Sequence, residues 1–261
     1  MTAASGWDCH VHVFDAAARA LPGHYSPRTA ALADAEQLGH EHGIGHLVLV
    51  QPSVYGSDNT VLLRALEGSQ GRHRGVAVVD ASARDAELDR LQAAGVRGVR
   101  FNLVSPVGNG GDALRALAPR LRARGWHAQW YVPASELAWL AGLQLDTGLP
   151  FVLDHLGGIC AGDLDEGHWT ALAELAAGGA WLKLSGWYRL RAREPYDTLV
   201  PQVERAARLF GTRLVWGSDW PHTSLPAAAP RHATLLAPVR AALGEDGLRQ
   251  VLHHNPPRLY F

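Results

Sequence analysis

Residues 7–13 read WDCHVHV, and apolar and polar residues alternate along them. This alternation is typical of a β-strand, in which successive side chains point to opposite faces of a sheet. His10 and His12 therefore share a face, so both imidazoles can converge on one ligand, water molecule or metal ion. The alternative is a strand whose histidines are satisfied by polar neighbours or lie near the surface. The predicted apolar face consists of Trp7, Cys9, Val11 and Val13, and the polar face of Asp8, His10 and His12.

Two later segments combine an apolar run with histidine or aspartate. Asp154 and His155 follow a short apolar run, and Asp219 ends the segment WGSD. Strand alternation places Phe151, Leu153 and His155 on one predicted face. A distant histidine and aspartate in matching strand contexts favour a reaction centre over isolated structural histidines. The alternative for Asp219 is a cap on the helix that follows its Gly-Ser turn.

Short segments rich in Val and Leu alternate along the chain with Ala-, Leu- and Arg-rich segments of helical period. Eight such β/α units, with no linker of disordered composition, predict a (β/α)₈ barrel as one domain over residues 1–261. An open doubly wound sheet is the alternative, but it gives the first and eighth strands no reason to share chemistry. The predicted strands are 7–13, 46–52, 74–80, 96–102, 126–132, 150–156, 180–185 and 213–219. The predicted helices are 28–42, 58–68, 83–94, 112–124, 134–142, 167–177, 195–210 and 230–253.

Polar residues stand near the carboxyl ends of all but one of these predicted strands. In barrels of this type the working groups sit at those ends. Buried polar residues without a common site would be costly, because each of them needs a partner. The sequence therefore predicts one shared site built from His10, His12, Gln51, Ser53, Arg100, Asn102, Tyr131, His155, Ser185 and Asp219.

The composition narrows the possible partners. With 24 basic and 25 acidic residues the formal net charge is −1, so the chain as a whole has no bias toward nucleic acid or anionic lipid. We expect a small-molecule partner and a monomer or small homo-oligomer. Because the sequence shows neither an apolar stretch of about 20 residues nor a basic region followed by an apolar run, we expect no membrane span and a cytoplasmic location. Cys9 and Cys160 cannot form a disulfide framework.

Motifs of a known superfamily occur here in order and nearly end to end. They are DCHVHVFD, VLVQPSVYGSDN, RGVAVVD, GVRGVRFN, GWHAQWYV, DHLGG, LVWGSDWPH and NPPRLY. On these segments the chain resembles the amidohydrolase superfamily, of the amidohydrolase 2 type, and within it the branch of 2-pyrone-4,6-dicarboxylate lactonases and sugar lactonases. The resemblance implies a barrel hydrolase with His10, His12, His155 and Asp219 as its catalytic core.

These four residues suit the hydrolysis of a lactone. Asp219 would act as general base toward the attacking water. The three histidines would present N–H donors to the carbonyl oxygen as it gains negative charge, and Tyr131 would add another. We therefore predict a hydrolase that opens a small carboxylated lactone, such as a pyrone, a muconolactone or a sugar-acid lactone.

The role of a metal ion is the main alternative in this mechanism. The three histidines and Asp219 form a suitable N/O ligand set for one divalent ion such as Zn²⁺ or Mn²⁺. A binuclear site generally needs a bridging ligand from the fourth or fifth strand, where this chain has Arg100 and Tyr131, and Arg100 would oppose a nearby cation. The resemblance to the pyrone lactonases implies metal independence. We expect no required metal, with one Zn²⁺ or Mn²⁺ ion as the alternative.

Two arginines indicate an anionic substrate. Arg100 lies on an inward face and Arg189 follows an aromatic loop, and guanidinium groups suit bidentate binding of a carboxylate. The alternative for Arg100 is an internal ion pair with Asp80 or Asp154. The alternative for Arg189 is a solvated loop charge.

The resemblance to the dicarboxylate lactonases is incomplete at two positions. Those enzymes are expected to use further arginines where this chain has Pro106 and Gly158. A substrate with two carboxylates would therefore lack partners here. We predict a smaller or singly charged lactone.

Further substrate contacts are expected from loops near the core. The candidates are Ser53, Tyr55, Asn59, Asn102 and His222, although Asn59 is equally suited to cap a helix. Lys183 shares strand parity with Ser185 and receives no predicted role. The alternative functions are a metal-dependent decarboxylase or amide hydrolase, a lactone isomerase and, more distantly, a catalytically silent binding barrel.

Overall fold

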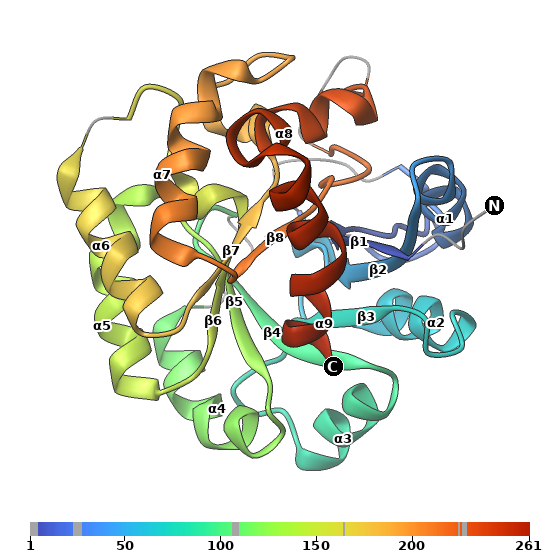
Figure 1. Ribbon diagram of the computed structural model, residues 1–261. Helices are drawn as coiled ribbons and strands as arrows, with labels where there is room; N and C mark the ends of the chain where they lie inside the picture. Colours follow the sequence, from blue (N-terminus) through green and yellow to red (C-terminus); the bar gives the residue numbers. More distant parts are fainter. Residues whose placement is uncertain (1–4, 23–27, 106–109, 164, 224, 226–228) are drawn as a thin grey trace.

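Figure 1 shows the computed structural model of the chain, in which helices surround a sheet of eight parallel strands. The structure describes residues 5–22, 28–105, 110–163, 165–223, 225 and 229–261, so Pro106 lies outside the described residues. The strands are β1 (Gly6–Val11), β2 (Ile44–Val50), β3 (Arg74–Ala77), β4 (Val96–Asn102), β5 (His127–Tyr131), β6 (Phe151–Leu153), β7 (Trp181–Leu184) and β8 (Leu214–Trp216). The helices are α1 (Leu32–Glu41), α2 (Thr60–Gly68), α3 (Asp85–Ala93), α4 (Gly111–Ala123), α5 (Leu137–Thr147), α6 (Glu166–Ala177), α7 (Val200–Phe210), α8 (His232–Arg249) and α9 (Asn255–Tyr260).

The ring of strands is completed between β1 and the segment that follows β8. The strands pair in sequence order from β1 to β8. Val11 forms a parallel bridge with Trp220, the N–H of His12 donates to Trp220 O at 2.8 Å, and the N–H of Asp219 donates to His10 O at 2.9 Å. The predicted (β/α)₈ barrel is therefore confirmed. Its closure brings Asp219 beside the first strand.

Apolar side chains form one layer inside the barrel and another between the strands and the helices. The inner layer includes Val50, Val152 and Val215. The outer layer includes Phe101 of β4 and Trp130 of β5, whose rings stack at 4.7 Å between centroids. The alternation predicted for β4 and β5 is thus present, with Arg100 and Gln129 turned to the barrel interior.

The predicted single apolar face of residues 7–13 is wrong. Trp7 and Cys9 belong to the inner layer, whereas Val11 and Val13 pack in the outer layer. The register between β1 and β2 shifts between Asp8 and Val11, so the simple alternation is interrupted there.

The face predicted for the sixth strand is also wrong. Phe151 and Leu153 pack in the outer layer, and β6 ends at Leu153. His155 lies beyond the strand with φ 51°, in the left-handed region. This turn of the backbone, rather than strand alternation, directs the imidazole to the barrel mouth.

Several helices differ from their predicted limits: α1 begins at Leu32 rather than at residue 28, α7 begins at Val200 rather than at residue 195, and two others differ as follows. α5 begins at Leu137 and continues to Thr147, beyond the predicted end at residue 142, because Leu143, Gln144 and Thr147 are buried against the rest of the fold. It ends where Gly148 adopts a left-handed conformation, with φ 59°. The predicted helix 230–253 is divided into α8, a π-helical turn at Gln250–His254 and the short α9.

The last helix closes the end of the barrel at which the strands begin. Tyr260 is fully buried, its ring stacks with Trp7 at 6.2 Å, and its carbonyl oxygen accepts from Arg74 Nε at 3.2 Å. Any ligand must therefore enter from the opposite end.

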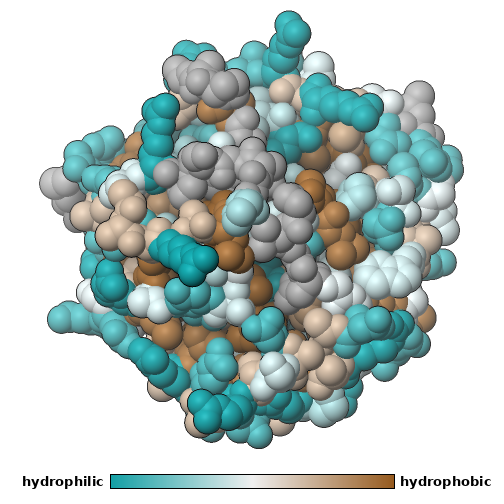
Figure 2. Space-filling model, turned by 180° about the vertical axis from the view of Figure 1, so that it is seen from behind, coloured by the Kyte–Doolittle hydropathy of each residue, from teal (hydrophilic) through white to brown (hydrophobic). Residues whose placement is uncertain are grey.

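The face drawn in Figure 2 carries both hydrophilic and hydrophobic side chains. On the face drawn in Figure 2, hydrophilic side chains occupy much of the outline and hydrophobic ones gather in several smaller groups. Among the described residues, no helix has the length and hydrophobicity that crossing a membrane requires.

Candidate active site

Four polar atoms meet at the open end of the barrel, beyond the carboxyl ends of β1, β6 and β8. Asp219 Oδ1 lies 3.7 Å from Nε2 of His10, 3.7 Å from Nε2 of His12 and 4.0 Å from Nε2 of His155. The Nε2 atoms of His10 and His12 are 3.2 Å apart. All four side chains are buried. The structure thus brings together the four residues that the sequence singled out.

The second ring nitrogen of two histidines fixes how each imidazole faces the centre. His12 Nδ1 lies 2.7 Å from Val50 O, and because a carbonyl oxygen only accepts, Nδ1 carries the proton and Nε2 of the neutral ring presents a lone pair. His155 Nδ1 lies 3.0 Å from Ser185 Oγ, a hydroxyl that can donate to it. The proton of neutral His155 then resides on Nε2, which has no hydrogen-bond partner among the described residues.

A buried network of charges lies against His10. Asp154 Oδ1 is 3.2 Å from His10 Nδ1 and 3.5 Å from Lys183 Nζ. Asp154 Oδ2 accepts from Gln129 Nε2 at 3.2 Å and lies 3.4 Å from Arg100 Nε. Lys183 Nζ also donates to Gln129 Oε1 at 2.8 Å. Asp154, one of the two partners considered for Arg100, is therefore its partner in the structure.

The outer oxygen of Asp219 is held by the loop after β7. Tyr188 OH donates to Asp219 Oδ2 at 2.5 Å, and Arg189 Nε donates to the same atom at 2.6 Å. The Arg189 side chain is only 11% exposed, so the alternative of a solvated loop charge is wrong. These two donors fix the carboxylate so that Oδ1 faces the three imidazoles.

Glycines and left-handed residues let the loops approach the site closely. A Cβ at Gly186 would lie 2.4 Å from His155 Nδ1, and one at Gly217 would lie 2.6 Å from His10 Cβ. Asp219 itself has φ 64°. Left-handed backbone at a residue other than glycine costs about 1 kcal/mol or more and is concentrated at functional sites. The strain at His155 and Asp219 therefore supports a functional role for this end of the barrel.

Known proteins are similar to this chain over almost its whole length. Residues 7–261 match the family described as Amidohydrolase. The chain belongs to the amidohydrolase family. It is 33% identical to a 2-pyrone-4,6-dicarboxylate hydrolase of Comamonas testosteroni, over 97% of this chain and 89% of that protein, and 32% identical to a 4-sulfomuconolactone hydrolase of Rhizobium radiobacter, with the same coverage of both. A solved structure of a probable 2-pyrone-4,6-dicarboxylic acid hydrolase from Acinetobacter baumannii, with citric acid bound, superimposes with a TM-score of 0.86 at 26% identity, covering 98% of this chain and 99% of that one.

The other predicted contact residues of this amidohydrolase divide into two groups, and two of them lie at the reaction centre. The Tyr131 ring packs edge-on against His155 at 4.9 Å between centroids. His222 is buried, lies 5.8 Å from the Tyr188 ring between centroids, and has no partner for Nδ1 among the described residues.

The remaining predicted contacts serve the loops. Tyr55 OH donates to Asp15 O at 3.1 Å and its ring packs with Phe14, whereas Asn102 Oδ1 accepts from the N–H groups of Val104 and Ser105. Asn59 stands at the N-cap position of α2 but bonds to the backbone of Val78, so the expected side-chain cap is absent, and Asp58 accepts from the N–H of Thr60. Ser53 is buried in a single 3₁₀ turn.

Sequence reasoning assigned no role in the site to Lys183 or Tyr188, and it considered Asp154 only as a partner of Arg100. Lys183, Asp154 and Tyr188 all contact the core directly or through one partner. A signal for Lys183 was present, because a lysine within an apolar strand needs a buried carboxylate. Tyr188 has no comparable signal, since the loop that carries it follows no regular period.

Burial and charge give the site unusual proton affinities. Burial raises the pKa of Asp219, but Arg189 and the nearby imidazoles oppose this and hold that pKa well below its ordinary range. Burial lowers the pKa of His155 to about 4 and that of His222 to about 4. Burial also raises the pKa of Asp8 to about 6. The folded amidohydrolase therefore holds an ionised Asp219 among neutral imidazoles.

We expect the stability of the protein to fall as the pH is lowered from 6.5 toward 4. His155, His222 and His232 have a pKa of about 4 in the folded state, and His127 has a pKa of about 3, so unfolded chains bind these protons first. Each such imidazole lowers the free energy of unfolding by up to about 1.4 kcal/mol for each pH unit by which the pH is lowered. Asp8, whose pKa is raised, has the opposite effect and offsets the contribution of about one imidazole.

Urea denaturation at several pH values measures this slope. His232→Asn removes one partly buried imidazole. We expect this variant to lose less free energy of unfolding per pH unit than the wild type, by the contribution of one histidine. His254→Asn, at an exposed position, is the matched control. A stability independent of pH between 6.5 and 4.5 would contradict the neutral state assigned to these rings.

Proposed function

We propose that this amidohydrolase opens a small carboxylated lactone by adding water to the ring carbonyl. The observation that carries the proposal is the convergence of one ionised carboxylate oxygen, Asp219 Oδ1, with three imidazoles at the barrel mouth. Lactone hydrolysis needs a base for the water and a donor for the developing oxyanion, and this group supplies both. The activities named for the two relatives, on a pyrone and on a muconolactone, support the same chemistry.

Asp219 acts as the general base in this proposal. Its Oδ1 has no hydrogen-bond partner among the described residues, whereas Oδ2 is held by Tyr188 and Arg189. A water on Oδ1 would also be within reach of the His12 Nε2 lone pair, which accepts its second proton in a hydrogen bond. The low pKa of the carboxylate weakens the base, and close positioning of the water compensates for this.

His155 acts as the principal donor to the oxyanion. Its Nε2 carries the proton when Ser185 donates to Nδ1, and it faces the centre without a partner in the described structure. Asp154 orients the His10 ring through Nδ1, and His10 Nε2 lies 3.7 Å from Asp219 Oδ1. Once the tetrahedral intermediate collapses, the proton taken by Asp219 passes to the leaving ring oxygen, which yields the hydroxy acid.

The tightest set of possible metal ligands consists of His10, His155 and Asp219, whose ligand atoms lie within 4.8 Å of one another, and His12 Nε2 lies 3.2 Å from that of His10. Three Nε2 atoms and one carboxylate oxygen are a suitable ligand set for Zn²⁺, and each histidine has a polar partner on its other ring nitrogen, as metal-binding histidines do. If bound, the ion would be held by His10, His12, His155 and Asp219, where it would polarise the lactone carbonyl or the water.

We nevertheless propose that the reaction requires no metal. Arg100 and Lys183 pair with Asp154, and Arg189 pairs with Asp219, so both carboxylates nearest the histidines already have cationic partners. A divalent cation would add two uncompensated positive charges to a buried region, which is electrostatically costly.

We expect chelation to leave the activity unchanged. Protein treated with a strong chelator and shown by elemental analysis to hold less than about 0.05 metal ions per chain should keep its full kcat on a lactone. Adding Zn²⁺ should inhibit, because the ion would occupy the water position between Asp219 and the histidines. Loss of activity on chelation, with recovery on adding one equivalent of Zn²⁺ or Mn²⁺, would establish the metal-dependent alternative.

The metal-ligand geometry also favours a second candidate function, a metal-dependent decarboxylase or amide hydrolase on the same scaffold. Product analysis separates it from lactone opening, because decarboxylation releases CO₂ and amide hydrolysis releases an amine. A lactone isomerase would convert one ring to another without taking up water.

A further inference from the structure

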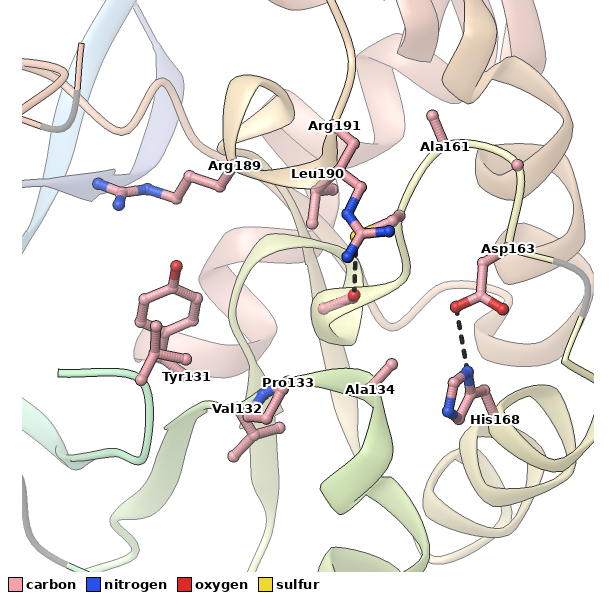
Figure 3. A pocket seen from close by; sticks show the side chains of 14 residues that line it. Tyr131, Val132, Pro133, Ala134, Ala161, Asp163, His168, Arg189, Leu190 and Arg191 are labelled. Atoms are coloured by element: carbon pink, nitrogen blue, oxygen red, sulfur yellow. Dashed lines mark hydrogen bonds and ion pairs between the residues drawn. The ribbon is translucent and has the colours of Figure 1, made fainter. Parts of the chain in front are cut away.

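A cavity of about 620 Å³ lies beside the reaction centre, outside the carboxyl ends of β5, β6 and β7. Figure 3 shows Tyr131 and Arg189 at one end of it and Asp163 and His168 at the other. Tyr131 and Arg189 line the cavity and also contact the catalytic group, since the Tyr131 ring packs against His155 and Arg189 bonds to Asp219, so the cavity borders the reaction centre. Its size exceeds what a small lactone ring alone would fill.

The wall of the cavity combines apolar side chains with a tightly packed glycine. Val132, Pro133 and Leu190 give it an apolar lining. A Cβ on Gly158 would lie 2.5 Å from Val132 O and 2.9 Å from Ala134 N, both backbone atoms, so no larger residue fits this wall without a shift of the chain. The left-handed φ of 77° at Gly158 restricts the position further. The wall of the cavity at Gly158 is therefore closely packed against the backbone of residues 132–134.

Arg191 is the charged residue that distinguishes the cavity. It is exposed and lines the space, and in Figure 3 its guanidinium points toward the side of the cavity that carries Pro133 and Ala134. Its φ of 57° is left-handed, a strained conformation for a residue other than glycine. In the described parts of the chain no carboxylate lies within ion-pair distance of Arg191, whereas Arg100 and Arg189 are paired with Asp154 and Asp219.

The acidic residue in the cavity does not compensate Arg191. Asp163 Oδ2 is 3.0 Å from His168 Nδ1, and Asp163 Oδ1 accepts from the N–H of Asp165 at 3.0 Å. Both oxygens of Asp163 are thus engaged within the loop before α6. An anion entering the cavity would find Arg191 as its partner.

We propose that this cavity is a subsite for an acidic arm of the substrate. The proposal rests on the proposed lactone hydrolase and narrows its substrate to a lactone with one carboxylate on a flexible side chain several atoms long. The ring lies at Asp219 and the histidines, the aliphatic part of the arm lies against Val132, Pro133 and Leu190, and the carboxylate pairs with Arg191. This assigns the expected single charge of the substrate to Arg191 rather than to Arg100.

Three lactones with the same ring test the subsite: one with a carboxylate arm, one with an amide arm of equal length, and one with no arm. The wild-type enzyme should prefer the carboxylate arm over the amide arm by about 10- to 100-fold in kcat/KM, the range of a charge-assisted pair. Arg191→Met should abolish this preference by raising KM, and it should leave the armless lactone unchanged. Arg193→Met, on the same loop but outside the cavity lining, is the matched control.

A filled cavity gives an independent readout. Ala161→Phe places a ring in the space and should raise KM for both armed lactones but not for the armless one. Arg191→Lys, which keeps the charge, should retain part of the preference. Equal kcat/KM for the carboxylate and amide arms in the wild type, or an unchanged preference in Arg191→Met, would overturn the subsite.

Binding measurements separate this inference from the proposed function. If no lactone is hydrolysed, the proposed function fails, but calorimetry with the ring-opened hydroxy acids still tests the subsite. Wild type should bind the product with the carboxylate arm about 10-fold or more tightly than the amide analogue, and Arg191→Met should not. Equal affinities would overturn the subsite whatever the activity.

Discussion

Replacing Asp219 with asparagine should lower kcat on a lactone by about 10²- to 10⁴-fold, the contribution of a positioned general base. The amide has nearly the same size as the carboxylate, so Tyr188 and Arg189 can still contact it. It cannot take a proton from water, however, and the attacking nucleophile is left inactive. KM should change much less than kcat, because the base acts in the chemical step.

Asp80→Asn is the matched control for this variant. Asp80 is exposed and accepts a hydrogen bond from Ser57, away from the three histidines. Its replacement should leave kcat within about twofold, since surface substitutions have small effects. Thermal unfolding of both variants shows whether the fold persists. An Asp219→Asn enzyme that is folded and retains more than a tenth of the wild-type kcat would remove Asp219 from the role of base.

Replacing Asp154 with asparagine should cost about 3–5 kcal/mol of stability, because it leaves two buried cations without their carboxylate. Lys183 Nζ and Arg100 Nε both lie within 3.5 Å of an Asp154 oxygen, and the Lys183 side chain is fully buried. For a chain of this length such a loss lowers Tm by about 10 °C. The activity should fall too, because His10 loses the contact that orients its ring.

A double variant distinguishes charge from packing in this result. Lys183→Met added to Asp154→Asn removes one of the two buried cations that have lost their carboxylate partner, so part of the lost Tm should be recovered. The activity should stay low, because His10 still lacks the contact that orients its ring. Arg64→Met breaks an exposed ion pair with Asp15 and should change the stability by at most about 1 kcal/mol. If Asp154→Asn and Arg64→Met have equal effects on Tm, the buried network does not stabilise the fold as described.

The sequence was most informative where residues stand close together along a strand. The His10/His12 pair was identified from its spacing, and the aspartate after WGS from its strand context and from the resemblance to the superfamily. Barrel closure brings the two segments together. The alternation of β4 also placed Arg100 in the interior beside its carboxylate partner. The inferences for the histidine pair and for Arg100 depend only on regular geometry, which a sequence pattern reports directly.

The sequence was least informative where the backbone departs from regular geometry. The register shift in β1 and the left-handed turn at His155 cannot be inferred from alternation, which assumes an unbroken strand. The same turn explains why His155 reaches the site from the position after Asp154, whose side chain also faces inward. The pairing of Arg189 with Asp219 joins two irregular loops, and only the folded chain shows it.

The balance of charges links stability to function in this amidohydrolase. The carboxylate that stabilises Lys183 and Arg100 also contacts His10, and the arginine that holds Asp219 also lines the adjoining cavity. Substitutions in this network should therefore affect folding and catalysis together, whereas Arg191 should affect substrate choice alone.

Hydrolysis of a lactone in ¹⁸O-labelled water tests most directly whether the barrel mouth activates water. With the chelated wild-type enzyme, we expect mass spectrometry to find one ¹⁸O atom per molecule of hydroxy acid, located in the new carboxylate, and Asp219→Asn should form almost no labelled product. A product without ¹⁸O, or one labelled at the alcohol oxygen, would contradict attack of an Asp219-activated water on the lactone carbonyl.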